Sequence, residues 1–287
     1  MYKPTAKSCI VAGCSVSCLS FILLIVLAFF LISKFNVLDN LFLHNSTQKS
    51  HMSPKSKPIA ITVGLISDTE NDWDYLEIAL NDLKKRGVTD VFHLGDISHL
   101  GVPKDLSTAN EYFVKSGLKV HPIPGDRDLW KSKGLEAFSS VFGSAYGVVE
   151  VGNVKFLLIN NSDEYAGIDT VQWKYIQENL PSSKFVLLHN PIYFGNKSLW
   201  GKGMGEYSTS VDSQRRSLLD TARSFSSVSA IFGGDQHLFS ESVDSVRDTL
   251  FHYVVGATSS DRNLERPNMA VLTVYEDGDY YVEKISF

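Results

Sequence analysis

Acidic and imidazole side chains follow five apolar stretches of the sequence, each at the point where the stretch ends. They are Asp68, Asp96, Asp126, His189, Asp235 and His237. Carboxylate and imidazole groups are side chains that commonly bind metal ions or transfer protons. An Asp after a strand can also simply open a turn. Because five separate ends carry Asp or His, turn formation alone is a poor explanation, and we expect a shared binding or catalytic site.

The apolar stretches are predicted to be β-strands that alternate with helices. The strands that end at these polar residues are predicted at 59–67, 88–94, 118–124, 184–189 and 228–232. The other predicted elements are helices at 73–86, 105–116, 169–179 and 211–225, a hairpin turn at Gly152-Asn153, and strands near 250–256, 269–275 and 279–286. This alternation predicts a layered α/β fold. In open sheets of that class, ligands bind at the carboxyl ends of the strands.

The polar residues and their neighbours form five short blocks that resemble those of the calcineurin-like metallophosphoesterases. The blocks are Asp68-Thr69-Glu70, Gly95-Asp96, Gly125-Asp126-Arg127-Asp128, His189 and Gly234-Asp235-Gln236-His237. The family pattern is D-x-H, G-D, G-N-H-D/E, a single H, and G-H-x-H, in that order. The resemblance covers residues 58–287. It implies a four-layer α/β/β/α sandwich.

The resemblance also implies two divalent metal ions. It assigns the first ion to Asp68, Glu70, Asp96 and His237, and the second to Asp96, Asp126, His189 and Asp235. Three of these residues depart from the family pattern, namely Glu70, Asp126 and Asp235. Each replacement is itself a metal-ligating type, which favours a retuned site over a decayed one. An oxygen-rich set of ligands favours Mn²⁺ or Mg²⁺, with Ca²⁺ as a further option.

Arg127 stands where the family has its catalytic His. Arginine does not donate a proton, because its pKa exceeds about 12, but it can hold phosphate oxygens in a bidentate manner. We therefore assign Arg127 to catalysis and substrate binding, and substrates with a pyrophosphate bond suit it best. An alternative is that Arg127 forms a salt bridge with a metal site that has been vacated. Asp128 is also assigned to catalysis, where it is predicted to orient Arg127 or a ligand. Asn190 and His99 are predicted to contact the substrate.

The resemblance implies a hydrolase that cleaves a phosphoester or pyrophosphate bond with metal-activated water. The alternative is a catalytically silent domain that acts as a binding module. Five ligand carboxylates and two divalent cations give a net charge of −1, which favours the silent domain. Metal-ligating types at all seven positions favour the enzyme. The expected partner is a phosphorylated substrate, whose class the sequence does not specify.

Residues 8–33 contain no charged side chain, a run of 26 positions. A helix of that length spans the roughly 30 Å hydrocarbon core of a bilayer, so we predict a single-pass anchor after a tail at 1–7. A cleaved signal peptide is the alternative, although its apolar region is usually shorter. Lys3 and Lys7 favour a cytoplasmic N-terminus and an extracytoplasmic domain. Residues 34–57 are predicted to be a polar linker, and 58–287 the phosphoesterase domain.

Composition excludes several other classes of protein. The 27 basic and 32 acidic residues give a net charge of −5, so no nucleic acid is expected as a partner. The only cysteines are Cys9, Cys14 and Cys18, in or beside the predicted anchor. The rest of the chain therefore contains no thiol nucleophile, zinc–thiolate site or disulfide.

Overall fold

The computed structural model of the chain describes residues 57–132, 134–194, 203–263 and 265–287. The predicted tail and anchor, and all of the predicted linker except Lys57, lie outside these residues. Within the described ranges, no helix is both long enough and apolar enough to cross a membrane.

The described strands form two sheets. Those of the first sheet are β1 (Ile59–Ile66), β2 (Asp90–His93), β3 (Lys119–Pro122), β10 (Asn268–Tyr275) and β11 (Tyr280–Ser286). Their spatial order is β11-β10-β1-β2-β3. β1, β2 and β3 are parallel, with Val63 paired to Asp90 and Asp90 paired to Lys119. Their carboxyl ends therefore meet at the same edge of the sheet.

The second sheet contains the remaining described strands. They are β4 (Gly147–Val151), β5 (Val154–Leu158), β6 (Phe185–Leu187), β7 (Ala230–Gly233), β8 (Ser240–Val243) and β9 (Phe251–Val254). Their order is β4-β5-β6-β7-β9-β8. β4 and β5 form the predicted hairpin, which turns at Gly152 with φ of 59°. β5, β6, β7 and β9 are parallel, so this sheet also presents a row of carboxyl ends.

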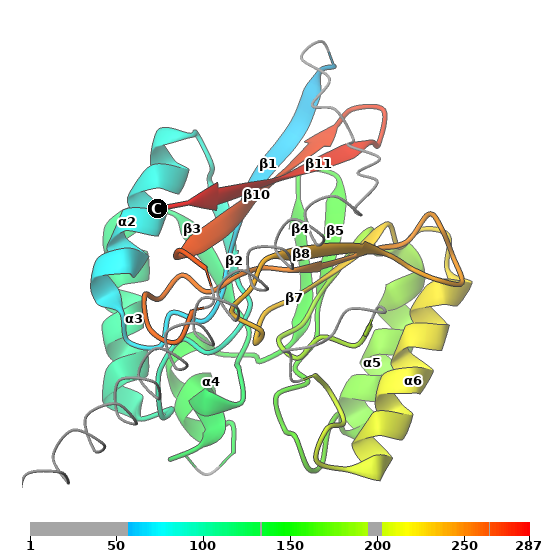
Figure 1. Ribbon diagram of the computed structural model, residues 1–287, viewed down its shortest axis with the longest axis horizontal. Coiled ribbons are helices and arrows are strands. Elements are labelled where there is room, and N and C mark those ends of the chain that lie inside the picture. Colours follow the sequence, from blue (N-terminus) through cyan, green and yellow to red (C-terminus); the bar gives the residue numbers. More distant parts are fainter. Residues whose placement is uncertain (1–56, 133, 195–202, 264) are drawn as a thin grey trace, which may run out of the picture. The chain divides into compact units, whose positions relative to one another are not determined.

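Helices cover the outer face of each sheet (Figure 1). The helices on the first sheet are α2 (Trp73–Lys85), α3 (Pro103–Ser116) and α4 (Glu136–Phe142), and those on the second are α5 (Thr170–Asn179) and α6 (Thr209–Ser224). The buried face of α2 carries Leu76, Leu80 and Leu83 at helical spacing. Pro103 begins α3, and Gly117 ends it in the left-handed conformation with φ of 74°.

The main core lies between the two sheets. Phe92 of the first sheet packs against Phe156 of the second, with 4.6 Å between ring centroids, and Phe156 packs against Phe185 at 5.3 Å. Separate apolar clusters fill the space between each sheet and its helices. These three layers of buried side chains confirm the predicted α/β/β/α sandwich. Two short elements, α4 and β8, were not predicted from the sequence.

Candidate metal centre

Five strand-end loops, from both sheets, converge on one place. Asp68, Asp96 and Asp126 follow β1, β2 and β3 of the first sheet, while His189 and Asp235 follow β6 and β7 of the second. Backbone hydrogen bonds tie neighbouring loops together. Asp68 N–H donates to the Gly95 carbonyl at 3.0 Å, and Gly234 N–H donates to the His189 carbonyl at 2.8 Å. The site is thus built at the seam of the two sheets.

The backbone is left-handed at many residues of these loops. The predicted ligands with positive φ are Asp68 (51°), Glu70 (47°), Asp96 (53°), Asp235 (66°) and His237 (50°). Among the described non-glycine residues, only Asn71 and Arg262 share this conformation. It costs on the order of 1–3 kcal/mol for a residue with a Cβ atom. Strain concentrated in this way is characteristic of functional sites, where the surrounding fold holds side chains in one direction.

Gly125 allows two of the loops to approach very closely. A Cβ atom at this position would lie 2.1 Å from Oδ1 of Asp96 and 2.2 Å from its backbone nitrogen. Both distances are far inside van der Waals contact. Glycine is therefore required here so that the carboxylate of Asp96 can face Asp126 and His189.

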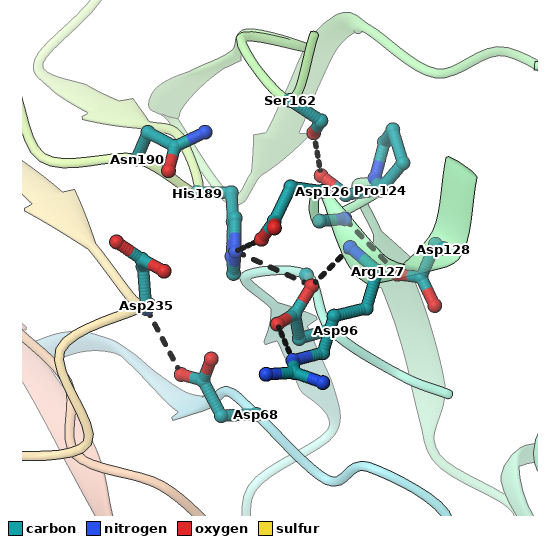
Figure 2. Close-up of polar contacts among 12 residues, drawn as sticks. Asp68, Asp96, Pro124, Asp126, Arg127, Asp128, Ser162, His189, Asn190 and Asp235 are labelled. Atoms are coloured by element: carbon teal, nitrogen blue, oxygen red, sulfur yellow. Dashed lines mark hydrogen bonds and ion pairs between the residues drawn. The ribbon is translucent and has the colours of Figure 1, made fainter. Parts of the chain in front are cut away.

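The orientation of His189 is fixed by a hydrogen bond behind it. Its Nδ1 donates to the Leu94 carbonyl at 2.7 Å, and the ring is fully buried. Nε2 faces the carboxylates, 3.3 Å from Oδ1 of Asp126 and 3.4 Å from Oδ1 of Asp96 (Figure 2). It donates to them when protonated and can offer its lone pair when a cation takes the place of that proton. A histidine held this way by a carbonyl is a typical arrangement for metal-binding imidazole.

The side chains around His189 fit a divalent cation. Two groups of three residues each place their potential ligand atoms within 4.8 Å of one another. One group is Asp68, Asp96 and His189, and the other is Asp126, His189 and Asp235. Oδ1 of Asp68 is buried and accepts no hydrogen bond from the described residues, while Oδ2 accepts one from the backbone of Asp235. A buried carboxylate oxygen without a donor is costly unless a cation neutralises it. The oxygen-rich donor set matches hard cations.

The electrostatics of this cluster also call for a positive charge. Burial raises the pKa of Asp96 well above its usual range; His189 opposes this shift, and Asp126 and Asp68 add to it. Burial disfavours protonated His189, but the surrounding carboxylates outweigh it and raise the pKa of the ring well above its ordinary value. The cluster therefore attracts a proton or a metal cation.

Asp128 supports the site from the side and points away from the carboxylate cluster (Figure 2). It is fully buried and accepts hydrogen bonds from the backbone of Ile97, Ser98 and Gly125, and from the Ser98 hydroxyl. Burial raises its pKa, and these donors oppose the rise. Asp128 thereby joins the Asp96 loop to the Gly125 turn. It is a positioning residue for both.

Arg127 lies inside the site. Its Nε is 2.7 Å from Oε1 of Glu70 and 3.2 Å from Oδ2 of Asp96, and its backbone N–H donates to Oδ1 of Asp96 at 3.0 Å. The side chain is 19% exposed, so it is not sealed from solvent. It also lies 5.0 Å from the centroid of Trp130, an indole that is 55% exposed and that sequence analysis did not select.

Arg262 is a second arginine at the site that sequence analysis missed. It lies in the loop between β9 and β10, and its Nη2 forms an ion pair with Oε2 of Glu70. Glu70 is buried, and a guanidinium contacts each of its two oxygens. The positive φ of Arg262, 52°, is the structural sign of its special position. No motif in the sequence marks it.

The remaining predicted site residues lie at the margin of the cluster. Nε2 of His237 is 3.6 Å from both Asp68 Oδ1 and Glu70 Oε1. His99 is 40% exposed, with Nδ1 3.9 Å from Oε2 of Glu70, which leaves it accessible to a ligand. The side-chain amide of Asn190 is buried and donates to the Asn161 carbonyl at 3.0 Å. The amide therefore already donates a hydrogen bond within the protein, to the loop that contains Asn161.

Comparisons with known proteins give matches only at the level of structure. The sequence matches no known protein family and no curated protein. A dimetal phosphatase from Danio rerio is 16% identical, with a TM-score of 0.60 over 80% of this chain and 99% of that one. The purple acid phosphatase PPD1 of yellow lupin is 13% identical, with a TM-score of 0.57 over 79% of this chain and 51% of that one.

A third similar structure is a Plasmodium protein described as the anchor in the inner membrane complex. It is 14% identical, with a TM-score of 0.53 over 79% of this chain and 84% of that one. Together with the phosphatases, it confirms at the level of fold the resemblance seen in the sequence blocks. The described residues between 57 and 287 therefore share the fold of these phosphatases, as the resemblance to the calcineurin-like metallophosphoesterases predicted.

Proposed function

We propose that this protein is a metal-dependent hydrolase of phosphoester or pyrophosphate bonds. The observation that carries the proposal is the convergence of Asp68, Asp96, Asp126, His189 and Asp235 at one seam, with His189 oriented by a carbonyl. These residues would hold a divalent cation, with Mn²⁺ and Mg²⁺ favoured by the oxygen donors. When bound, such a cation acts as a Lewis acid on a phosphoryl oxygen and makes water a better nucleophile.

The residues of the chain itself would bind and orient the substrate. The guanidinium of Arg127, on a partly exposed side chain, can hold phosphoryl oxygens, while Glu70 and Asp96 contact its Nε. His99 is accessible at the edge of the site and could donate a hydrogen bond to the same group. Because arginine supplies no proton to a leaving group, a phosphoanhydride, which leaves as a stable anion, is the favoured substrate class.

The test is hydrolysis by the full-length protein in the presence of Mn²⁺ or Mg²⁺. Bis-p-nitrophenyl phosphate and a pyrophosphate compound would be assayed side by side, with Asp96→Asn as the inactive variant. We expect turnover that needs the added cation and falls by at least 100-fold in the variant. Turnover equal in both proteins, or none in either, would contradict the proposal.

A second candidate function is a catalytically silent binding module. The observation in its favour is the pair of ion contacts between Glu70 and the two arginines, which neutralise a predicted ligand. The Plasmodium protein of similar fold is described as an anchor, which is a binding role. Saturable binding of inorganic phosphate by the cation-loaded protein, without hydrolysis of either substrate, would support this candidate over the first.

We also propose that residues 8–33 anchor the protein in a bilayer, with the N-terminus cytoplasmic and the phosphoesterase domain extracytoplasmic. The proposal rests on the 26 uncharged positions and on Lys3 and Lys7 before them. Extraction of membranes with alkaline carbonate should leave the protein in the pellet. A protease added to intact cells or vesicles should cleave the domain only from the extracytoplasmic side. Release by carbonate would contradict the anchor.

A further inference from the structure

We propose that the site holds one divalent cation, and that the guanidinium groups of Arg127 and Arg262 take the place of a second. The inference rests on the proposed function, because it concerns the same site and specifies how its positive charge is supplied. It concerns the half of the site formed by Glu70 and His237, away from Asp126 and Asp235.

The first argument is the position of Arg127. A cation shared by Glu70 and Asp96 would have to lie between their carboxylates. The Nε of Arg127 already lies there, 2.7 Å from Oε1 of Glu70 and 3.2 Å from Oδ2 of Asp96. The backbone of Arg127 is fixed as well, since its N–H donates to Oδ1 of Asp96. The arginine and a second cation would therefore compete for the same carboxylate oxygens.

The second argument is that the loop carrying Arg262 is firmly attached to the site. Thr258 N–H donates to the Ser67 carbonyl at 2.8 Å, and Ser259 N–H donates to the Asp68 carbonyl at 3.1 Å. Ser260 donates to Asp72 through both its backbone N–H, at 2.9 Å, and its hydroxyl, at 2.7 Å. These bonds run along the Asp68 loop and hold the chain that delivers Arg262 to Glu70.

The third argument is charge. Glu70 is buried, and each of its oxygens contacts a different guanidinium. Two arginines bring a formal charge of +2, the same as one divalent cation. A further cation at Glu70 would be repelled by both guanidinium groups at short range. The replacement of a metal by two arginines is therefore balanced in charge.

The fourth argument is that the described ligand groups mark only one ion. Both groups within 4.8 Å include His189, and neither includes Glu70 or His237. Only Nε2 of His189 is available to a cation, because Nδ1 donates to the Leu94 carbonyl. One imidazole nitrogen binds one metal. The two groups therefore describe one cation position beside His189, surrounded by Asp68, Asp96, Asp126 and Asp235.

This arrangement gives the site two unlike positive groups. A phosphoryl group would be held by the cation near His189 on one side and by the guanidinium of Arg127 on the other. An arginine fixes oxygen atoms in a plane but does not activate water. The site should then hold the reacting phosphoryl group of its substrate between these two charges.

The experiment is Mn²⁺ titration of the full-length protein by calorimetry, with electron paramagnetic resonance on the same samples. We expect one bound Mn²⁺ and a mononuclear six-line spectrum. Glu70→Gln and Asp235→Asn are matched carboxylate-to-amide changes. The first should keep one bound Mn²⁺ with less than a threefold change in Kd, and the second should weaken binding at least tenfold.

Two bound Mn²⁺ ions, an exchange-coupled spectrum, no binding, or loss of the ion in Glu70→Gln would overturn the inference, as would unchanged binding in Asp235→Asn. Circular dichroism would verify folding, and if Glu70→Gln fails to fold, the wild-type stoichiometry and spectrum decide alone. Hydrolysis measured in the same samples separates the two proposals. One ion without turnover contradicts the hydrolase only, and two ions with turnover contradict the single-cation site only.

Discussion

Arg127 and Glu70 form an ion pair across two strand-end loops, with 2.7 Å between Nε and Oε1. Because the same Nε also lies 3.2 Å from Oδ2 of Asp96, the position of the guanidinium matters as well as its charge. Arg127→Lys keeps the charge and loses the planar group. We expect hydrolysis to fall by about 10–100-fold, measured as kcat/KM. Arg216→Lys, at an arginine whose side chain is 63% exposed, is the matched control and should leave the rate unchanged.

The close approach at Gly125 predicts a sharp effect of a single methyl group. Gly125→Ala would place a Cβ atom 2.1 Å from Oδ1 of Asp96, so the carboxylate must move. We expect the affinity for Mn²⁺ to fall at least tenfold, as measured by calorimetry. Gly147→Ala is the control, because a Cβ atom there meets no atom within 4 Å. Equal affinities in the two variants would show that the Gly125 contact does not set the ligand geometry.

The buried carboxylate of Asp128 should be important for stability. In Asp128→Asn, an amide NH₂ would face one of the backbone N–H groups of Ile97, Ser98 or Gly125, which now donate to the carboxylate. We expect the free energy of unfolding to fall by about 2–4 kcal/mol, measured by urea denaturation. Asp248→Asn, at an exposed position, should change it by less than about 0.5 kcal/mol. If the free energy of unfolding falls by less than about 1 kcal/mol in Asp128→Asn, Asp128 is not the positioning residue that joins the Asp96 loop to the Gly125 turn.

A buried histidine far from the site should make the fold sensitive to acid. Burial lowers the pKa of His252 to about 4, despite its 2.9 Å contact with Asp244. The unfolded chain, with an ordinary histidine pKa of about 6.5, binds a proton first as the pH falls. Stability should therefore decrease between pH 6.5 and 4, with a slope approaching about 1.4 kcal/mol per pH unit from this group.

His252→Gln removes that proton while keeping a donor for Asp244. Its stability, measured by denaturation between pH 6.5 and 4, should fall less steeply than that of the wild type. The carboxylates of the metal centre titrate in both proteins and cancel in the difference. Parallel pH profiles would mean that His252 is not the responsible group.

Bound cation should stabilise the folded protein against heat. A ligand that binds only the folded state at a hundredfold excess over its Kd adds about 2.7 kcal/mol to the free energy of unfolding. Adding Mn²⁺ should raise Tm by roughly 5–10 °C, and a chelator should reverse the change. Asp96→Asn should show no such shift. A rise of equal size in that variant would indicate binding elsewhere.

Much of the fold could be predicted because its signals are local. Apolar runs such as 59–67 and the spacing of Leu76, Leu80 and Leu83 mark buried strands and helices directly. Two elements lacked such signals. α4 is only seven residues long, and β8 (Ser240–Val243) is an edge strand whose side chains alternate between intermediate and exposed. Both depend on tertiary packing, so no short window of sequence could mark them.

Some residues of the site could also be predicted from local sequence signals, and others could not. The residues at strand ends could be predicted because the ends of parallel strands meet at one edge. Arg262 could not, since its loop is long and its role depends on the hydrogen bonds that attach residues 258–260 to Ser67, Asp68 and Asp72. The orientation of Asn190 was equally hidden, because it depends on Asn161, 29 positions earlier in the chain.

The hydrogen bond from His189 to the Leu94 carbonyl joins the second sheet to the first. The predicted ligands are divided in the same way, with Asp68, Asp96 and Asp126 on one sheet and His189 and Asp235 on the other. A cation held by residues of both sheets would therefore tie the two halves of the sandwich together. Metal release and separation of the sheets should be one cooperative event, and amide hydrogens at β2 and β6 should exchange together when the metal is removed.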